Sequence, residues 1–230
     1  MSRAGDRWPR PRPDAVFFDL DGTLADTAHD LSAPINAMRI EQGLAPLALA
    51  ELRPFASMGA RGLIGRGLGV ASTDVRFEGL RDEFLRRYEQ AMVVHTRLFD
   101  GMPQVLHRLE QTGIRWGVVS NKVERYVRRI LDELDLGGRS AVAIGGDTAG
   151  QPKPHPEPLL LAARLTGLAP ARCVYVGDDR RDVAAAHAAG MAAVAAAYGY
   201  SGDESPPAAW GADALVDTPQ RLLDLLLKDA

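Results

Sequence analysis

Short, continuous apolar runs recur along this chain, and each is followed by a segment with helical periodicity. The runs cover residues 15–18, 114–119, 141–144, 172–176 and 191–196. Because they do not alternate between apolar and polar residues, each run predicts a strand that is buried on both faces. Strands of this kind that alternate with helices are typical of a parallel sheet covered by helices on both sides. We therefore expect an α/β fold.

The segment between the first two runs is nearly a hundred residues long, which is more than a crossover helix or an ordinary loop requires. Leu31, Ile35 and Met38 share one helical face within it, and a longer apolar stripe runs over residues 77–92. The pattern predicts a Rossmann-like parallel-sheet core domain with an inserted helical cap domain. The expected boundaries are 14–26 and 96–230 for the core, 27–95 for the cap, and 1–13 for a flexible N-terminal tail.

Composition and charge narrow the class of partner. The chain has 27 basic and 30 acidic residues and a formal charge of −3, so we expect no nucleic-acid partner. Its one cysteine, Cys173, lies in an apolar run, which excludes an internal disulfide and favours a reducing compartment. No secretory pattern or membrane-length apolar run is present, so we expect a cytoplasmic protein with no membrane partner. Monomer and homodimer both remain open.

A glycine-rich stretch over residues 59–69 invites comparison with a nucleotide-binding loop. Gly62 and Gly67 have the required spacing, but Leu68 stands where the lysine belongs and no strand pattern precedes the stretch. We expect a flexible turn between two cap helices here.

Acidic residues follow the first apolar run directly, in the sequence Val16-Phe17-Phe18-Asp19-Leu20-Asp21-Gly22-Thr23. Two like charges at the end of a buried strand are costly unless a cation or a proton compensates them. A bound divalent metal would compensate the two charges, and hard oxygen ligands favour Mg²⁺.

Three further motifs place polar side chains after, or between, the predicted strands. Ser120 and Asn121 end the run at 114–119, Lys153 lies in a proline-rich segment, and Gly177-Asp178-Asp179 with Asp182 follows the run at 172–176. A helix cap explains Ser120 or one of the acids alone, but it does not explain all three acids.

In this order, the four motifs resemble those of the haloacid dehalogenase superfamily, and the resemblance extends from about Asp14 to Leu226. The helical cap between the first and second motifs is similar to that of its phosphoglycolate phosphatase group. The resemblance implies a magnesium-dependent phosphatase in which Asp19 is the nucleophile and Asp21 the general acid and base. It further implies that Ser120, Asn121 and Lys153 compensate the charge of the phosphate. Mg²⁺ would be held by Asp19, by the backbone carbonyl of Asp21 and by Asp178. Asp182 and Asp179 would support these groups from the outer shell of the metal.

Other members of that superfamily provide alternatives. A dehalogenase needs no acid like Asp21, because a halide leaves without a proton. A phosphomutase would differ in how well its cap excludes water, and the sequence does not show this property, so a phosphomutase is the main alternative. A non-catalytic binding protein of the same fold is a further alternative, but such a protein would normally lack the nucleophile or the lysine.

Substrate specificity is expected to reside in the cap, where Arg61 and Arg66 are candidates to bind an acidic substrate. Local stretches such as residues 95–102, 116–122 and 210–213 are similar to N-acetylmuramic acid 6-phosphate phosphatases. The expected partner is thus a small phosphorylated metabolite. Both candidate substrates, 2-phosphoglycolate and N-acetylmuramic acid 6-phosphate, carry a carboxylate.

Overall fold

A six-stranded parallel sheet forms the centre of the computed structural model, which describes residues 12–202 and 205–227. The strands are ordered β5-β4-β1-β6-β7-β8 across the sheet. Their bounds are β1 Ala15–Phe18, β4 Arg115–Val119, β5 Ala143–Ile144, β6 Cys173–Gly177, β7 Ala192–Ala196 and β8 Ala214–Val216. The α/β prediction is confirmed, and the tail expected over residues 1–13 lies almost entirely outside the described residues.

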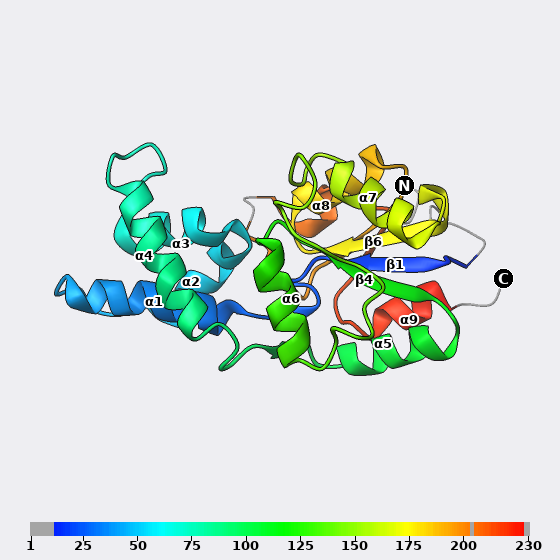
Figure 1. Cartoon of the computed structure of the whole chain (residues 1–230), viewed down its shortest axis with the longest axis horizontal. Coiled ribbons are helices and arrows are strands. Elements are labelled where there is room, and N and C mark those ends of the chain that lie inside the picture. Colours follow the sequence, from blue (N-terminus) through cyan, green and yellow to red (C-terminus); the bar gives the residue numbers. More distant parts are fainter. Residues whose placement is uncertain (1–11, 203–204, 228–230) are drawn as a thin grey trace.

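Helices cover both faces of this sheet, as Figure 1 shows. Val16 and Phe18 of β1 face one apolar cluster with α5, α6 and α9, whereas Ala15 and Phe17 face a second cluster with α7 and α8. The alternation follows from the two-residue period of a strand, which explains why β1 is apolar throughout. The helix bounds are α5 Met102–Gln111, α6 Glu124–Glu133, α7 Glu157–Thr166, α8 Arg180–Ala188 and α9 Arg221–Leu226; short 3₁₀ turns, η2 and η3, cover Pro170–Arg172 and Pro207–Ala209.

The edge strand β8 was missing from the sequence prediction. It has three residues, and Leu215 in its middle is 43% exposed. The sequence of such a short segment with one exposed side chain cannot be distinguished from that of a loop. The segment is a strand because it pairs with β7.

The inserted segment is helical, as expected, and lies beside the sheet at the end where β1 leads into α1 (Figure 1). Its elements are α1 Ala28–Glu41, α2 Leu49–Leu52, the 3₁₀ helix η1 Arg53–Met58, α3 Gly59–Leu68 and α4 Phe77–Gln90. An antiparallel pair of short strands, β2 Ala25–Asp26 and β3 Arg97–Leu98, joins the two chain crossings between cap and core.

A buried carboxylate holds these two crossings together. Asp30, near the start of α1, accepts hydrogen bonds from the backbone N–H groups of Val94, His95 and Thr96 and from the Thr96 hydroxyl. Since Asp30 is only 2% exposed, these bonds satisfy a charge that would otherwise be costly to bury.

The prediction of a flexible turn in the glycine-rich stretch is wrong, because residues 59–68 form the helix α3. A Cβ atom on Gly67 would lie 2.2 Å from Cγ2 of Ile35 on α1, and one on Gly62 would lie 2.4 Å from Cβ of Met58. The glycines therefore permit close packing of α3 against its neighbours. This packing offsets the low helix propensity of glycine.

Substitution of Gly67 by alanine is therefore expected to destabilise the protein by about 1–3 kcal/mol, because the added methyl group overpacks the contact with Ile35. Gly79 on α4 is the matched control: its added Cβ would meet no atom within 4 Å, so Gly79→Ala should stabilise the protein by about 0.4–1 kcal/mol. Urea unfolding of both variants measures the two effects. Equal effects of the two substitutions would contradict the packing argument.

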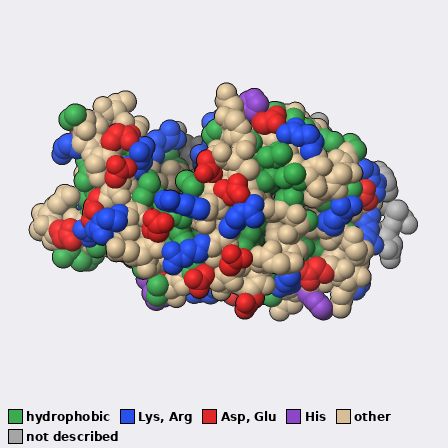
Figure 2. All heavy atoms as spheres, viewed as in Figure 1, with side chains coloured by type: hydrophobic (Ala, Val, Ile, Leu, Met, Phe, Trp, Pro, Cys, Tyr) green, Lys and Arg blue, Asp and Glu red, His purple; other side chains and the backbone are tan. Residues whose placement is uncertain are grey.

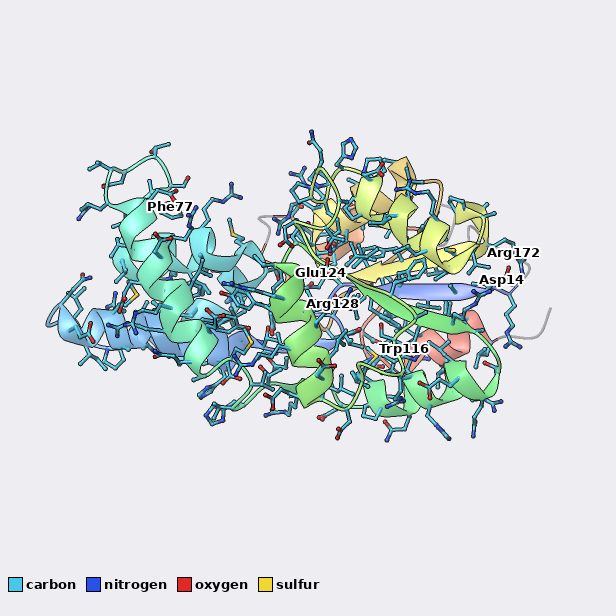
Figure 3. The ribbon with its side chains drawn as sticks, viewed as in Figure 1. Asp14, Phe77, Trp116, Glu124, Arg128 and Arg172 are labelled. Carbon is cyan, nitrogen blue, oxygen red and sulfur yellow. The ribbon has the colours of Figure 1, made fainter. Side chains whose placement is uncertain are left out.

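The surface of the molecule carries interspersed charges. Figure 2 shows acidic and basic side chains alternating over the face in view, and many of them are paired, such as Glu124 with Arg128 on α6 and Asp14 with Arg172 near the start of the sheet (Figure 3). Among the described residues, no helix is long and apolar enough to span a membrane.

Candidate active site

The polar motifs meet at the carboxyl edge of the sheet. Asp19, Ser120 and Asp178 directly follow β1, β4 and β6, and these three strands are neighbours in the sheet. Lys153 enters from the loop between β5 and α7. All four side chains are buried, with at most 8% exposure for each residue. Strand ends of a parallel sheet are where α/β proteins place ligands.

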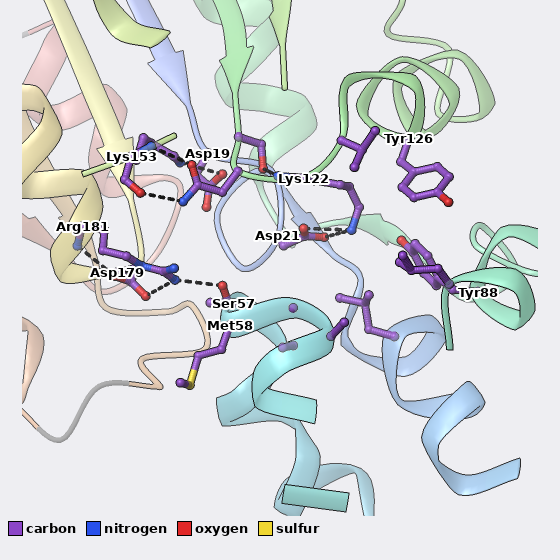
Figure 4. Close-up of a pocket in the computed structure, with 18 of the residues that line it drawn as sticks. Asp19, Asp21, Ser57, Met58, Tyr88, Lys122, Tyr126, Lys153, Asp179 and Arg181 are labelled. Carbon is purple, nitrogen blue, oxygen red and sulfur yellow. Dashed lines mark hydrogen bonds and ion pairs between the residues drawn. The ribbon is translucent and has the colours of Figure 1, made fainter. Parts of the chain in front are cut away.

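A cavity of about 230 Å³ opens between this edge and the cap (Figure 4). Core residues line one part of it, and cap residues from η1, the start of α3, and α4 line the rest. The lining includes Asp19, Asp21, Ser57, Met58, Phe84, Leu85, Tyr88, Ser120, Asn121, Lys122, Tyr126, Lys153, Asp179, Arg181 and Asp182. Its size suits a small metabolite.

Lys153 is fixed by four groups at once. Its Nζ lies 2.8 Å from Asp182 Oδ1, 3.0 Å from Asp19 Oδ1, 2.6 Å from the Tyr175 hydroxyl and 3.1 Å from the Val119 carbonyl oxygen. Burial alone would lower the pKa of Lys153, but the two carboxylates outweigh burial and raise it. The ammonium group therefore stays charged beside Asp19.

Asn121 holds the backbone of Lys153. Its side-chain amide donates to the Lys153 carbonyl oxygen at 2.8 Å, and its side-chain oxygen accepts from the Lys153 N–H at 2.8 Å. The reciprocal pair ties the end of β4 to the loop of Lys153. The Asn121 side chain is therefore a positioning group in this structure, and the residue also lines the cavity.

Three buried carboxylates provide a potential cation site. Oxygen atoms of Asp19, Asp178 and Asp182 all lie within 4.8 Å of one another. Burial first, and then the charges of Asp19 and Asp182, raise the pKa of Asp178 well above its usual range. Asp19 Oδ1 forms an ion pair with the Lys153 ammonium at 3.0 Å and has no hydrogen-bond partner among the described residues. Such a set of oxygen ligands fits a divalent cation such as Mg²⁺.

Neighbouring groups orient these acids. The Asp178 carboxylate accepts from the hydroxyls of Thr23 and Ser57 and from the Tyr200 N–H, so core and cap both contact it. Asp179 caps α8 through the N–H of Arg181 and also pairs with the Arg181 guanidinium at 2.7 Å. The Asp179 carboxylate therefore interacts mainly with Arg181.

Asp21 is held by two residues that the sequence motifs did not single out. Lys122 Nζ lies 2.9 Å and 3.1 Å from its two carboxylate oxygens, and the Thr27 hydroxyl donates to Oδ1 at 2.5 Å. Burial would lower the pKa of Lys122, but Asp21 and then Tyr88 raise it. The scarcity of lysine, with three in the chain, was the available signal for Lys122.

The cap arginines expected to contact the substrate are placed differently. Neither Arg61 nor Arg66 is among the residues that line the cavity. Arg66 instead pairs with Glu51 at 2.8 Å on the cap surface. The cations that do line it, among the described residues, are Lys122, Lys153 and Arg181.

A parallel sheet with acids and a lysine at its carboxyl edge, beside an inserted helical cap, defines a capped α/β protein with a candidate site between core and cap. The model of the family described as "Haloacid dehalogenase-like hydrolase" matches residues 16–196, and the chain belongs to this family.

Proteins named as phosphatases are similar to this chain over nearly its whole length. The chain is 49% identical over 210 residues to a phosphoglycolate phosphatase of Xanthomonas campestris pv. campestris (strain 8004), covering 91% of this chain and 95% of that protein. It is 42% identical over 217 residues to an N-acetylmuramic acid 6-phosphate phosphatase of Pseudomonas aeruginosa, covering 94% and 96%. The crystal structure of a predicted phosphoglycolate phosphatase from Haemophilus somnus 129PT superimposes with a TM-score of 0.81 at 27% identity, covering 94% and 99% of the two chains. The chain is therefore a phosphoric monoester hydrolase of the haloacid dehalogenase type.

Proposed function

We propose that this enzyme hydrolyses a small, carboxylate-bearing phosphomonoester through an aspartyl-phosphate on Asp19, with Mg²⁺ as cofactor. The observation that carries the proposal is Asp19 Oδ1, a buried carboxylate oxygen at the cavity with no hydrogen-bond partner among the described residues and with the Lys153 ammonium 3.0 Å away. A carboxylate in this environment can attack phosphorus, and the fixed ammonium compensates the charge of the phosphoryl group.

The reaction takes two steps. Asp19 attacks phosphorus, the bond between phosphorus and the ester oxygen breaks, and Asp21 gives its proton to the leaving oxygen. Water then attacks the aspartyl-phosphate, Asp21 takes a proton from that water, and phosphate leaves with Asp19 regenerated. Ser120 and the Asn121 backbone amide bind phosphate oxygens during both steps.

Charge at the site supports the need for a cation. The charged groups there are five aspartates and three cations, namely Asp19, Asp21, Asp178, Asp179, Asp182, Lys122, Lys153 and Arg181. Counted as ionised, they leave a formal charge of −2, which repels a phosphate dianion. A bound Mg²⁺ neutralises this excess, and Asp19, Asp178 and the Asp21 backbone carbonyl would hold it, with Asp182 and Asp179 in the outer shell.

Among carboxylate-bearing esters, N-acetylmuramic acid 6-phosphate is the proposed substrate. The cap presents an apolar and aromatic wall to the cavity that includes Leu31, Phe84, Leu85 and Tyr88, and Tyr126 of the core helix α6 adjoins it. A sugar can pack against such a wall, whereas 2-phosphoglycolate is too small to reach much of it. Contacts remote from phosphorus can be used to stabilise the transition state.

Phosphate release with a panel of phosphomonoesters at fixed Mg²⁺ tests this assignment. We expect kcat/KM for N-acetylmuramic acid 6-phosphate to exceed that for 2-phosphoglycolate by at least about tenfold, or about 1.4 kcal/mol of transition-state stabilisation. A tenfold preference for 2-phosphoglycolate would instead assign the smaller substrate. Formation of an isomerised phosphate ester without free phosphate would favour a phosphomutase.

A further inference from the structure

Lys122 is a cavity cation to which the proposed reaction assigns no role. Its Nζ donates to both oxygens of Asp21 and lies 4.8 Å from the centroid of the Tyr88 ring on α4. The other two cations that line the cavity are committed elsewhere among the described residues: Lys153 to Asp19 and Asp182, and Arg181 to Asp179.

Figure 4 shows Lys122 extending from the core toward Tyr88, with Tyr126 on the same side, while Asp19 and Lys153 lie on the other side of Lys122. Phosphate must bind at Asp19 for the proposed reaction. The part of the substrate that leaves with the ester oxygen would therefore extend toward Lys122 and the cap.

Tyr88 adds an independent observation at the same place. It is 1% exposed and lines the cavity, yet its hydroxyl has no hydrogen-bond partner among the described residues. An unsatisfied buried hydroxyl costs about 1–3 kcal/mol. That cost is removed when a ligand supplies an acceptor.

We propose that the Lys122 ammonium and the Tyr88 hydroxyl form a carboxylate-binding subsite for the leaving-group portion of the substrate. This inference rests on the proposed function and identifies the residues that select its substrate class. A carboxylate bound there accepts a charge-assisted hydrogen bond from Lys122 and a second bond from Tyr88. It also replaces Asp21 as the partner of Lys122, so Asp21 is free to turn toward the ester oxygen.

Two pairs of esters test the carboxylate. N-acetylmuramic acid 6-phosphate and N-acetylglucosamine 6-phosphate differ by the lactyl ether that carries it, and 2-phosphoglycolate and 2-hydroxyethyl phosphate differ by the carboxylate alone. The readout is the ratio of kcat/KM within a pair. The wild-type enzyme should prefer the acid by roughly 10- to 100-fold. Lys122→Met should remove most of this preference, and Tyr88→Phe should reduce it by roughly 3- to 10-fold.

Arg128→Met is the matched charge control, since Arg128 pairs with Glu124 on the exposed side of α6 and does not line the cavity (Figure 3). It should leave the ratio unchanged. Tyr88→Phe keeps the ring and removes a hydroxyl with no hydrogen-bond partner among the described residues, so it should fold as well as the wild type even if Lys122→Met does not. Dissociation constants measured with the Asp19→Asn protein provide the same comparison without turnover.

Several outcomes would overturn the subsite. One is a wild-type ratio near one, and another is a ratio that survives both substitutions. An equal loss for acid and neutral esters in Lys122→Met would mean that Lys122 only positions Asp21. Absence of phosphate release from every ester would instead reject the proposed function, and the dissociation constants would then decide on the subsite separately.

Discussion

Replacing Asp19 by asparagine is expected to reduce kcat by at least about 100-fold, because an amide cannot form the acyl-phosphate. Asparagine has nearly the same shape as aspartate, and the substitution removes one negative charge from the group that includes Asp178 and Asp182. The variant should therefore fold, and in the absence of metal it should melt no lower than the wild type. Steady-state phosphate release and thermal unfolding test both expectations.

Asp82→Asn provides the control for this experiment, since Asp82 has the same side chain on the exposed surface of α4, 73% exposed. It should keep full activity. If Asp19→Asn retains more than about one per cent of wild-type kcat in a preparation free of wild-type enzyme, Asp19 is not the nucleophile.

Removal of divalent metal by a chelator should abolish turnover, and Mg²⁺ should restore it. Ca²⁺ should restore it poorly, because its bonds to oxygen are roughly 2.3–2.6 Å against 2.0–2.1 Å for Mg²⁺ and would misplace Asp19 relative to phosphorus. The same site predicts a stability effect. Mg²⁺ at a hundredfold excess over its dissociation constant should stabilise the folded protein by about 2.7 kcal/mol.

Asp178→Asn separates this stability effect from activity. The substitution removes one of the three buried carboxylates, so most of the stabilisation by Mg²⁺ should disappear. Full turnover in excess chelator would remove the metal from the mechanism. A melting temperature that rises equally with Mg²⁺ in wild type and Asp178→Asn would place the metal elsewhere.

The strands of the sheet were predictable because their signal is local. A buried parallel strand needs an apolar run whatever its neighbours are, and residues 15–18 and 172–176 show such runs. The same runs placed Asp19 and Asp178 at strand ends, and the resemblance of the motifs assigned both to one metal site. In the structure β1 and β6 are neighbours, so their carboxyl ends share one edge. The pairing of β8, in contrast, depends on β7, and its three residues carry no distinctive pattern.

The helix α3 was beyond local prediction for a related reason. Glycine weakens a helix in isolation, so residues 59–68 read as a turn. What stabilises the helix is its close approach to Ile35 of α1, and that contact exists only after the cap has folded.

The sequence by itself determined which polar residues follow the buried strands, because the burial of a strand is a property of a short segment. Tertiary structure alone decided that Lys122 and Arg181 line the cavity beside Lys153, which its motif had already indicated. Arg66 is taken by Glu51, whereas Lys122 reaches Asp21, from which it is separated by 101 residues in sequence, and the ring of Tyr88 on the cap. Partner choice for a long charged side chain is set by the side chains that the fold brings within a few ångströms, since charge interactions weaken with distance and solvent screening.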